Sequence, residues 1–170
     1  KGMRSYSTDI KSPKSFNLSG YPLDMRLIKE SNKEVWDTQV QIIQQQITDE
    51  VIASAFSKFP KEVKGETIKD LKRKLKGRRR NLQKISDAYF KHLNKFQVII
   101  GTDKDDWFEI NRFKNGDTEI IAYRIIGGEK EDIFHKRRYK KAETKDIWIY
   151  GLDDDDRFVV NGVPGKKPIR

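Results

Sequence analysis

Two aspartate-rich segments contain the residues of this sequence that are best suited to holding a metal ion. They cover 101–111 and 151–161 and share the pattern G-x-D-x-D-D-x-F-x-[IV]-N at an offset of 50 positions. Carboxylate oxygens are hard ligands, so several of them in a turn that begins with glycine suit Ca²⁺. The candidate calcium ligands are the aspartates at the shared positions: Asp103, Asp105, Asp106, Asp153, Asp155 and Asp156.

The alternative role for these aspartates is structural. Each copy follows three apolar residues, 98–100 or 148–150, so the repeated unit is predicted to be strand, turn, strand. Aspartate closes tight turns through hydrogen bonds to nearby backbone. The copies also lack the second and third glycines of calcium-binding β-rolls, and they do not keep the EF-hand spacing. If the copies are equivalent, Phe108 and Phe158 should both be buried, and the last aspartates of the two turns should occupy matching places.

A run of basic residues is the strongest charge feature of the chain. Residues 69–84 include nine Lys or Arg and one Asp, so this window carries +8 of the net charge of +10. Such a run can neutralise phosphates of nucleic acid or of anionic lipid, although no base-reading motif accompanies it. It can equally be a solvated helix face or a face that docks a neighbouring acidic domain. The candidate residues for polyanion binding or docking are Lys72, Arg73, Lys74, Lys76, Arg78, Arg79 and Arg80.

Residues for autonomous catalysis are missing from the sequence. The chain has no Cys, which excludes a thiol nucleophile and a cysteine-ligated metal centre. Its two histidines, His92 and His135, lie in different halves, and His135 precedes three basic residues. No phosphate-binding glycine loop, G-x-S-x-G or H-E-x-x-H motif is present. We therefore predict no catalytic residue and no certain cofactor, with Ca²⁺ at the aspartate turns as the one candidate.

The spacing of apolar residues predicts an α+β fold, with an N-terminal helical bundle followed by an antiparallel β unit. We expect an extended arm over 1–30, the bundle over 31–95 and the β unit over 96–170. Hydrophobic residues make up 35% of the chain and charged residues 36%. The core is therefore lean, and its aromatic side chains must supply much of the buried area.

Three helices are predicted in the bundle. Ser31 begins a capping-box pattern for the first, and Thr48 is the expected N-cap of the second, which Pro60 ends. A third helix should run over about 67–94, where Gly77 favours a kink or a break. In the second half, Asn115-Gly116 is typical of a type I′ hairpin turn. The predicted strands cover 96–100, 107–113, 118–126, 133–139, 147–150 and 158–160.

Three stretches of the chain resemble a region of a known family. They are LKGRRRNL at 75–82, GTDKDD at 101–106 and ETKDIWIYGLDDDD at 143–156. They are similar to the region that follows the catalytic domain in large calcineurin-like metallophosphoesterases of the bacterial cell envelope. The resemblance implies a periplasmic or outer-membrane-associated location. The catalytic signatures of that family, such as D-x-H and G-N-H, have no counterpart here, so no catalytic residue is carried over.

These observations favour a non-catalytic accessory or connecting module of a larger envelope protein of the metallophosphoesterase type. Its partners would be neighbouring domains of the same polypeptide, and we expect the 170 residues to be an excerpt of that protein. No apolar run approaches the ~20 residues of a membrane-spanning helix. The alternative is a module that binds nucleic acid or another polyanion through 69–84. A third hypothesis is a phosphoesterase fragment whose arginine cluster contacts substrate.

Overall fold

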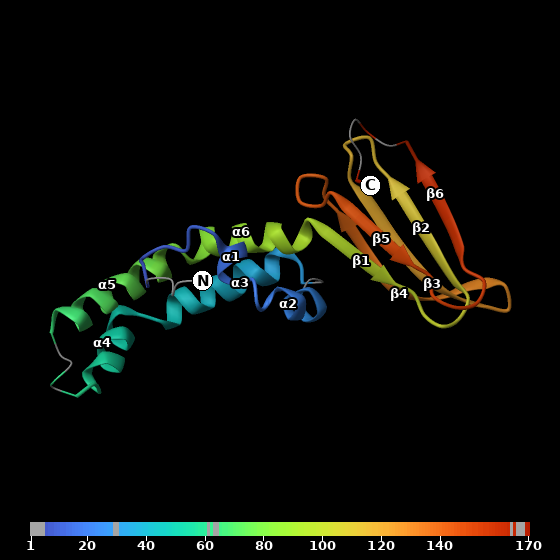
Figure 1. The fold of residues 1–170 in the computed structure, drawn as a ribbon. Helices are drawn as coiled ribbons and strands as arrows, with labels where there is room; N and C mark the ends of the chain where they lie inside the picture. The colour runs from blue at the N-terminus through green and yellow to red at the C-terminus, as the bar shows by residue number, and fades with distance from the viewer. Residues whose placement is uncertain (1–5, 29–30, 61, 63–64, 164, 166–168) are drawn as a thin grey trace. The chain divides into compact units, whose positions relative to one another are not determined.

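The computed structural model describes residues 6–28, 31–60, 62, 65–163, 165 and 169–170. In this part of the chain six helices precede six strands, which confirms the predicted α+β class (Figure 1). Contacts divide the chain between His92 and Leu93 into two compact units. We call residues 1–92 the helical unit and residues 93–170 the β unit. The division lies three residues before the boundary expected from the sequence.

Two short helices form where an extended arm was expected. They are α1 (Pro13–Phe16) and α2 (Tyr21–Leu27). The Ser12 side chain caps α1 by accepting a hydrogen bond from the Ser15 N–H at 3.3 Å. A proline occupies one of the first two positions of each helix. Serine followed by proline is a known helix start, so the prediction of an arm missed a local signal.

Helix α3 (Lys33–Gln46) begins one residue later than its predicted cap implies. The cap is Asn32, whose side-chain oxygen accepts a hydrogen bond from the Val35 N–H at 3.0 Å. Asparagine is at least as good an N-cap as serine, and here it takes the role that was expected of Ser31. The capping box was therefore predicted at the wrong residue.

Helix α4 (Asp49–Ser57) begins as predicted. Thr48 is its N-cap and accepts a hydrogen bond from the Val51 N–H at 3.3 Å. The helix ends at Ser57, before Pro60, which cannot continue a helix without loss of a backbone hydrogen bond.

Two consecutive helices, α5 (Glu66–Arg80) and α6 (Leu82–Asn94), replace the single long helix that was predicted. The break falls at Asn81 and not at Gly77. Gly77 is buried inside α5, and a Cβ atom there would lie 2.8 Å from the Thr8 Cβ. The glycine therefore allows residue 8 to approach the helix closely.

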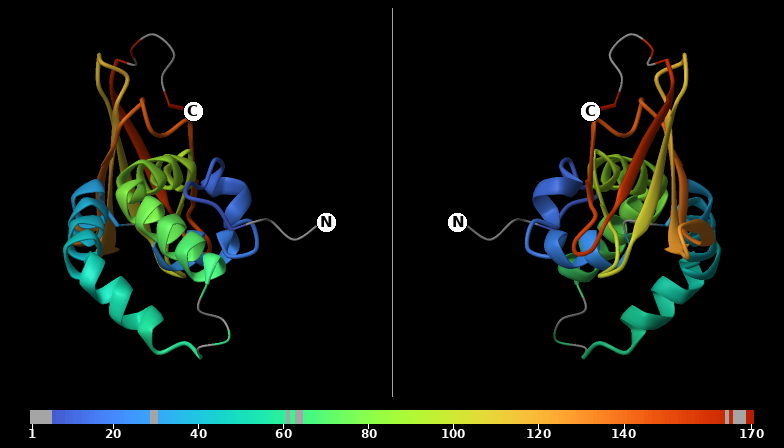
Figure 2. Two further views of the ribbon diagram at one scale, coloured as in Figure 1. Left: turned by 90° about the vertical axis from the view of Figure 1, so that its left-hand side faces the viewer. Right: turned by 90° about the vertical axis from the view of Figure 1, so that its right-hand side faces the viewer.

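Helix α3 runs antiparallel to α5 and α6 within the helical unit (Figure 2). Near the start of α3, the Trp36 ring meets the Phe90 ring edge-on at 5.7 Å between centroids. Near its end, the Gln44 Nε2 donates a hydrogen bond to the Arg79 carbonyl at 2.8 Å. These contacts lie at opposite ends of α3 and so fix the direction in which the helices pass each other.

The β unit contains two sheets, one with the order β1-β5 and one with the order β4-β3-β2-β6. The pairs β2–β3 and β3–β4 are antiparallel, but β1–β5 and β2–β6 are parallel. The prediction of a purely antiparallel unit was therefore wrong for these two pairs. The period of two in a strand does not record its direction. The strands are β1 (Phe96–Ile100), β2 (Asp106–Arg112), β3 (Thr118–Ile126), β4 (Glu129–Tyr139), β5 (Asp146–Tyr150) and β6 (Arg157–Gly162).

Two hairpin turns connect β2 to β3 and β3 to β4. The hairpin predicted at Asn115-Gly116 is present, but its turn is not type I′, because Gly116 has a positive φ (91°) and Asn115 does not. The Gly116 N–H bonds to the Phe113 carbonyl at 2.9 Å, which makes a three-residue loop that ends in glycine. In the second turn, Gly127 and Gly128 both have positive φ, 61° and 87°, as a type I′ turn requires.

The core of the β unit lies between the two sheets. Side chains from β1, β2, β3 and β4 form one buried cluster, and Ile147 and Ile149 of β5 pack against it. The cluster consists of Ile99, Phe108, Ile120, Ala122, Tyr139 and Ile169. The first copy of the repeat unit supplies β1 and β2, and the second supplies β5 and β6. Each copy therefore contributes one strand to each sheet.

Candidate functional site

The two copies of the repeat stack on each other in register. Each residue of β1 lies opposite the residue of β5 that is 50 positions later, from Phe96 and Asp146 onward. The same offset holds along β2 and β6, from Trp107 and Arg157 onward. The offset of the sequence repeat is therefore also the register of the parallel pairing, a relationship that was not predicted from the sequence.

Side chains at equivalent positions join the two copies. The Asn161 Nδ2 donates a hydrogen bond to the Asn111 Oδ1 at 3.0 Å. The Phe108 and Phe158 rings stack with their centroids 4.9 Å apart and an interplanar angle of 12°. Lys104 and Asp154 form an ion pair at 3.6 Å, which places one positive charge against the second turn.

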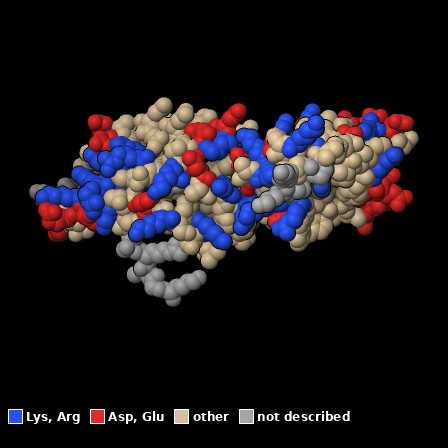
Figure 3. All heavy atoms as spheres, turned by 90° about the horizontal axis from the view of Figure 1, so that it is seen from above, with Lys and Arg blue, Asp and Glu red and all other residues tan. Residues whose placement is uncertain are grey.

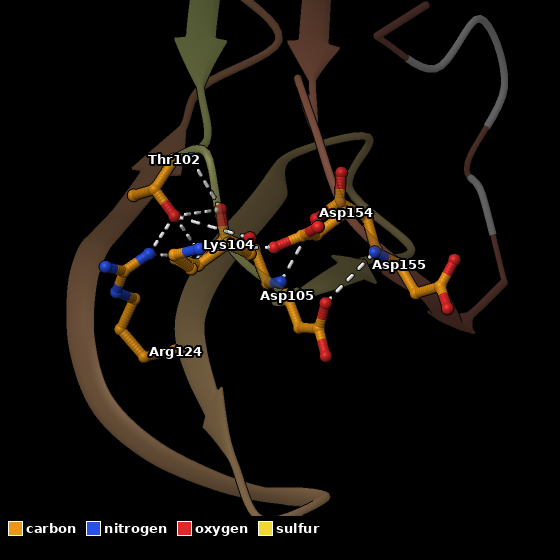
Figure 4. A network of polar contacts seen from close by, with 8 residues as sticks. Thr102, Lys104, Asp105, Arg124, Asp154 and Asp155 are labelled. Carbon is orange, nitrogen blue, oxygen red and sulfur yellow. Dashed lines mark hydrogen bonds and ion pairs between the residues drawn. The ribbon is translucent and has the colours of Figure 1, made fainter.

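The aspartates of the two turns bind backbone amides of the other copy. The Asp155 N–H donates to the Asp105 Oδ1 at 3.0 Å (Figure 4). In the opposite sense, the Asp106 N–H donates to the Asp156 Oδ1, also at 3.0 Å. Each copy thus supplies a carboxylate acceptor for one backbone amide of the other copy.

Asp106 is fully buried within the first turn. It accepts hydrogen bonds from the Thr102 N–H at 2.6 Å and from the Thr102 hydroxyl at 3.0 Å. Arg124, from the end of β3, forms an ion pair with Asp106 at 3.5 Å and a hydrogen bond with the same hydroxyl. A buried carboxylate is tolerated only when such partners replace water. These contacts therefore explain how Asp106 can be buried.

The six candidate calcium ligands do not converge on one point. Among the residues that the structure describes, no three His, Cys, Asp or Glu side chains are arranged to hold a metal ion. Asp105, Asp106 and Asp156 instead accept the hydrogen bonds that join and close the turns. The geometry therefore supports the structural alternative for these three residues. The remaining three candidates, Asp103, Asp153 and Asp155, have exposed side chains.

The surroundings of Asp156 in the second turn change the pKa of its carboxyl group. Burial raises its pKa above the ordinary value, the hydrogen bond from the Asp106 N–H opposes this, and the nearby charges of Asp106, Asp105 and Asp154 raise it further. The surroundings of Asp156 therefore disfavour the charged form of this carboxylate.

The expectation that both phenylalanines of the repeat are buried was wrong for one of them. Phe108 is fully buried, whereas 49% of the Phe158 surface is exposed. The in-register pairing still makes the two copies equivalent in position. Their burial differs because β2 lies between β3 and β6, while β6 lies at the edge of its sheet.

The basic candidates all lie on α5, and several have acidic or carbonyl partners. Asp49, at the start of α4, binds Lys76 at 2.6 Å and Arg79 at 2.8 Å. Arg79 also donates a hydrogen bond to the Ile47 carbonyl at 2.6 Å. Hydrogen bonds from Lys76 and then Arg79 lower the pKa of Asp49. Part of the basic run thus ties α5 to the start of α4.

Arg78 has aromatic partners at the N-terminal side of the helical unit. Its guanidinium lies 3.9 Å from the centre of the Tyr6 ring and 5.7 Å from that of Phe16. Its Nε donates a hydrogen bond to the Ser7 carbonyl at 2.8 Å. These contacts give Arg78 a packing role within the helical unit.

Another group of cations lines a shallow hollow on α5. Figure 3 shows basic side chains gathered over the helical unit, with acidic ones among them. Asp70 forms ion pairs with Arg73 and Lys74. The Lys72 ammonium lies 5.8 Å from the Phe56 ring centre. The hollow is lined by Lys69, Lys72, Arg73, Lys76 and Arg80.

An apolar cavity in the helical unit was not foreseen from the sequence. It has a volume of about 560 Å³, and its lining includes Trp36, Val40 and Tyr89. The Tyr89 hydroxyl donates a hydrogen bond to Asp24 at 2.5 Å, and the Asn17 side chain donates to that hydroxyl at 2.7 Å. Burial, together with the Asp24 carboxylate, raises the pKa of Tyr89 to about 12. This tyrosine is therefore neutral at physiological pH.

The two histidines are in different units and pack against aromatic rings. His92 stacks on Tyr21 with 4.8 Å between centroids. His135 stacks on Tyr139 at 6.3 Å, and its Nε2 lies 3.1 Å from the Tyr139 hydroxyl. Both positions support a structural role.

Comparison of the chain with protein-family models, with curated proteins and with solved structures found no significant match. Among the described helices, each is too short or too polar to cross a membrane.

Proposed function

We propose that this chain is a non-catalytic connecting module of a larger protein, in which stacked repeats form a rigid β element. The observation that carries the proposal is that the charged side chains of the candidate sites make hydrogen bonds and ion pairs within the fold. Asp105, Asp106 and Asp156 hold the two turns together, and Arg79 and Lys76 hold α5 to α4. Groups that are fixed in this way serve the fold and leave little for substrate.

The larger protein that we propose is an envelope metallophosphoesterase of bacteria, and this context rests on the sequence resemblance of 75–82, 101–106 and 143–156. The residues of the resemblance are compatible with a connecting role. The middle and last segments contain the repeat turns, whose aspartates make the inter-copy hydrogen bonds. The first segment contains Gly77 and Arg79, which are both used in packing of the helical unit.

The test of the proposal is an assay for phosphoester hydrolysis by the purified chain. We expect no turnover of generic phosphomonoesters or phosphodiesters in Mn²⁺, Zn²⁺ or Mg²⁺ above the rate in buffer. Turnover that co-purifies with the chain and is lost in Asp153→Asn or Arg79→Gln would contradict the proposal. It would support the third hypothesis, in which the arginine cluster contacts a phosphoester substrate.

Binding of a polyanion is the second candidate function, and the hollow lined by five Lys and Arg side chains favours it. Neutralising phosphates releases counterions, so log K for duplex DNA should fall against log[salt] with a slope of about −0.9 per phosphate contacted. Replacing Lys72, Arg73 and Arg80 with Gln should then flatten the slope by about three units. The matched control is Arg78→Gln, since Arg78 is held against Tyr6 and Ser7.

We expect the connecting role to prevail, with weak binding that is indifferent to base sequence at physiological salt. Tight binding that depends on Lys72, Arg73 and Arg80 but not on Arg78 would instead favour the polyanion function.

A further inference from the structure

The outer strands of the stack, β5 and β6, leave inward-facing apolar side chains without cover. Val160 of β6 and Ile110 of β2 line the same hollow between the sheets, and Phe158 stacks on Phe108. Yet 49% of the Phe158 surface and 59% of the Val160 surface are exposed. The second copy therefore exposes to solvent an apolar surface like the one that the first copy uses to bind the second.

Two hydrogen-bond acceptors of the second copy are also left open. In the first copy, the Asp105 carboxylate accepts the Asp155 N–H, and the Asn111 Oδ1 accepts the Asn161 side chain. The matching acceptors of the second copy are the Asp155 carboxylate and the Asn161 Oδ1. Neither has a hydrogen-bond partner within the part of the chain that the structure describes. An open strand edge with aligned acceptors is a template for further pairing.

The backbone at Arg170 shows which direction the edge of β5 accepts. The Arg170 N–H donates to the Lys145 carbonyl at 2.9 Å, and the Ile147 N–H donates to the Arg170 carbonyl at 2.7 Å. These are the two hydrogen bonds of a parallel pair centred on Asp146. Arg170 thus lies on the outer side of Asp146, as Phe96 lies on its inner side. Ile169, the preceding residue, is buried in the core.

We propose that the outer edge of β5 and β6 is a docking site for a third strand–turn–strand segment with the same pattern, G-x-D-x-D-D-x-F-x-[IV]-N. The segment runs parallel to β5 and β6, in the direction that the pairing of Arg170 with β5 shows. Its phenylalanine stacks on Phe158. Its asparagine donates to Asn161, and its turn donates an N–H to the Asp155 carboxylate. This inference goes beyond the connecting role and does not depend on it.

The negative charge of the second turn favours a docking segment that carries a cation. Asp153–Asp156 places four carboxylates in the second turn, and Lys104 of the first copy pairs with one of them, Asp154. A docking segment with lysine at the fourth position of the pattern offers a second cation to this turn. A segment with aspartate there adds to the repulsion.

The test extends the full chain by the sequence of residues 97–112 placed directly after Arg170, so that the extension continues the register of β1. Hydrogen exchange is then measured at the β6 amides, with and without the extension. We expect protection of the outward β6 amides to rise at least tenfold, with an increase in the urea midpoint. The matched control extension carries alanine in place of the phenylalanine and the asparagine of the pattern, and it should give a smaller gain.

Unchanged exchange at β6, or equal protection by both extensions, would overturn the proposal. Protection that rises with protein concentration would also overturn it, because it would show that the edge pairs with a second copy of the chain. If the extension disturbs folding, the same sequence is added to the unextended chain as a free peptide. Saturable perturbation of Phe158 and Asn161 resonances is then expected, and its absence contradicts the proposal.

Discussion

The ring of Phe158 lies parallel to that of Phe108 at 4.9 Å, although the two residues are 50 positions apart in sequence. Only Phe108 is covered on both sides. Phe108→Ala should therefore lower the free energy of unfolding by about 3–5 kcal/mol, and Phe158→Ala by only about 1–2 kcal/mol. Urea denaturation of the two variants measures the difference. Equal losses would mean that Phe158 is buried in solution.

Gly101 of the first copy lies close to the backbone of the second copy. A Cβ atom there would lie 2.6 Å from the Gly151 carbonyl oxygen and 2.7 Å from the Asp106 Oδ2. Gly101→Ala should therefore destabilise the chain by about 1–3 kcal/mol. The control is Gly65→Ala at the N-cap of α5, where no atom lies within 4 Å of the added Cβ, and its effect should stay within about 1 kcal/mol. A tolerated alanine at 101 would contradict the close stacking.

The raised pKa of Asp156 predicts an unusual dependence of stability on pH. Because the folded state holds the proton more tightly than the unfolded state, ionised Asp156 reduces stability above its folded pKa. This cost fades as the pH falls from the folded pKa toward the ordinary value of 3.8. Asp156→Asn, which keeps an acceptor for the Asp106 N–H, should thus stabilise the chain at pH 7.

The gain from Asp156→Asn should shrink between pH 7 and pH 4 in urea titrations. Asp153→Asn is the control, since it removes the same charge from an exposed side chain. A gain that is constant with pH, or equal in both variants, would argue against burial of Asp156 as the cause.

The contribution of Asp49 to stability should depend on pH with the opposite sign to that of Asp156. The pKa of Asp49 is lowered by hydrogen bonds from Lys76 and Arg79, so its stabilising contribution is present above 3.8 and is lost as the pH falls through the folded pKa. Asp49→Asn should lower stability at pH 7, and its effect should decrease as the pH falls below 3.8. In a background of Lys76→Gln and Arg79→Gln the same substitution should have a smaller effect. Additivity of these changes would contradict the ion pairs.

Local signals predicted the elements of this fold better than they predicted its pairing. Thr48 at a helix start and the hairpin at Asn115-Gly116 were identified because cap and turn chemistry is local. The parallel pairing of β2 with β6 was missed because the partner strands are 50 residues apart. The repeat itself contained that information, since equivalent residues that stack in parallel must share one offset.

The residues of the aspartate turns were identified from the sequence, but their role was not. Carboxylates in a glycine turn are typical both of metal sites and of hydrogen-bonded turns, and the sequence alone does not distinguish them. The distinction comes from Asp105 and Asp156, whose carboxylates accept hydrogen bonds from backbone amides of the other copy. Likewise, the partners of Arg78 and Arg79 lie in segments 30 to 71 residues away, beyond the reach of local patterns.

Cross-linking tests the register of the two copies most directly, because the chain contains no cysteine. The double variant Asn111→Cys with Asn161→Cys joins residues that are paired across β2 and β6. The control, Asn111→Cys with Val159→Cys, is two residues out of register and should lie beyond the ~7 Å Cα limit of a disulfide. Under mild oxidation, rapid disulfide formation in the first pair and little in the second is the expected result. Equal or reversed rates would show that the copies do not stack at an offset of 50 residues.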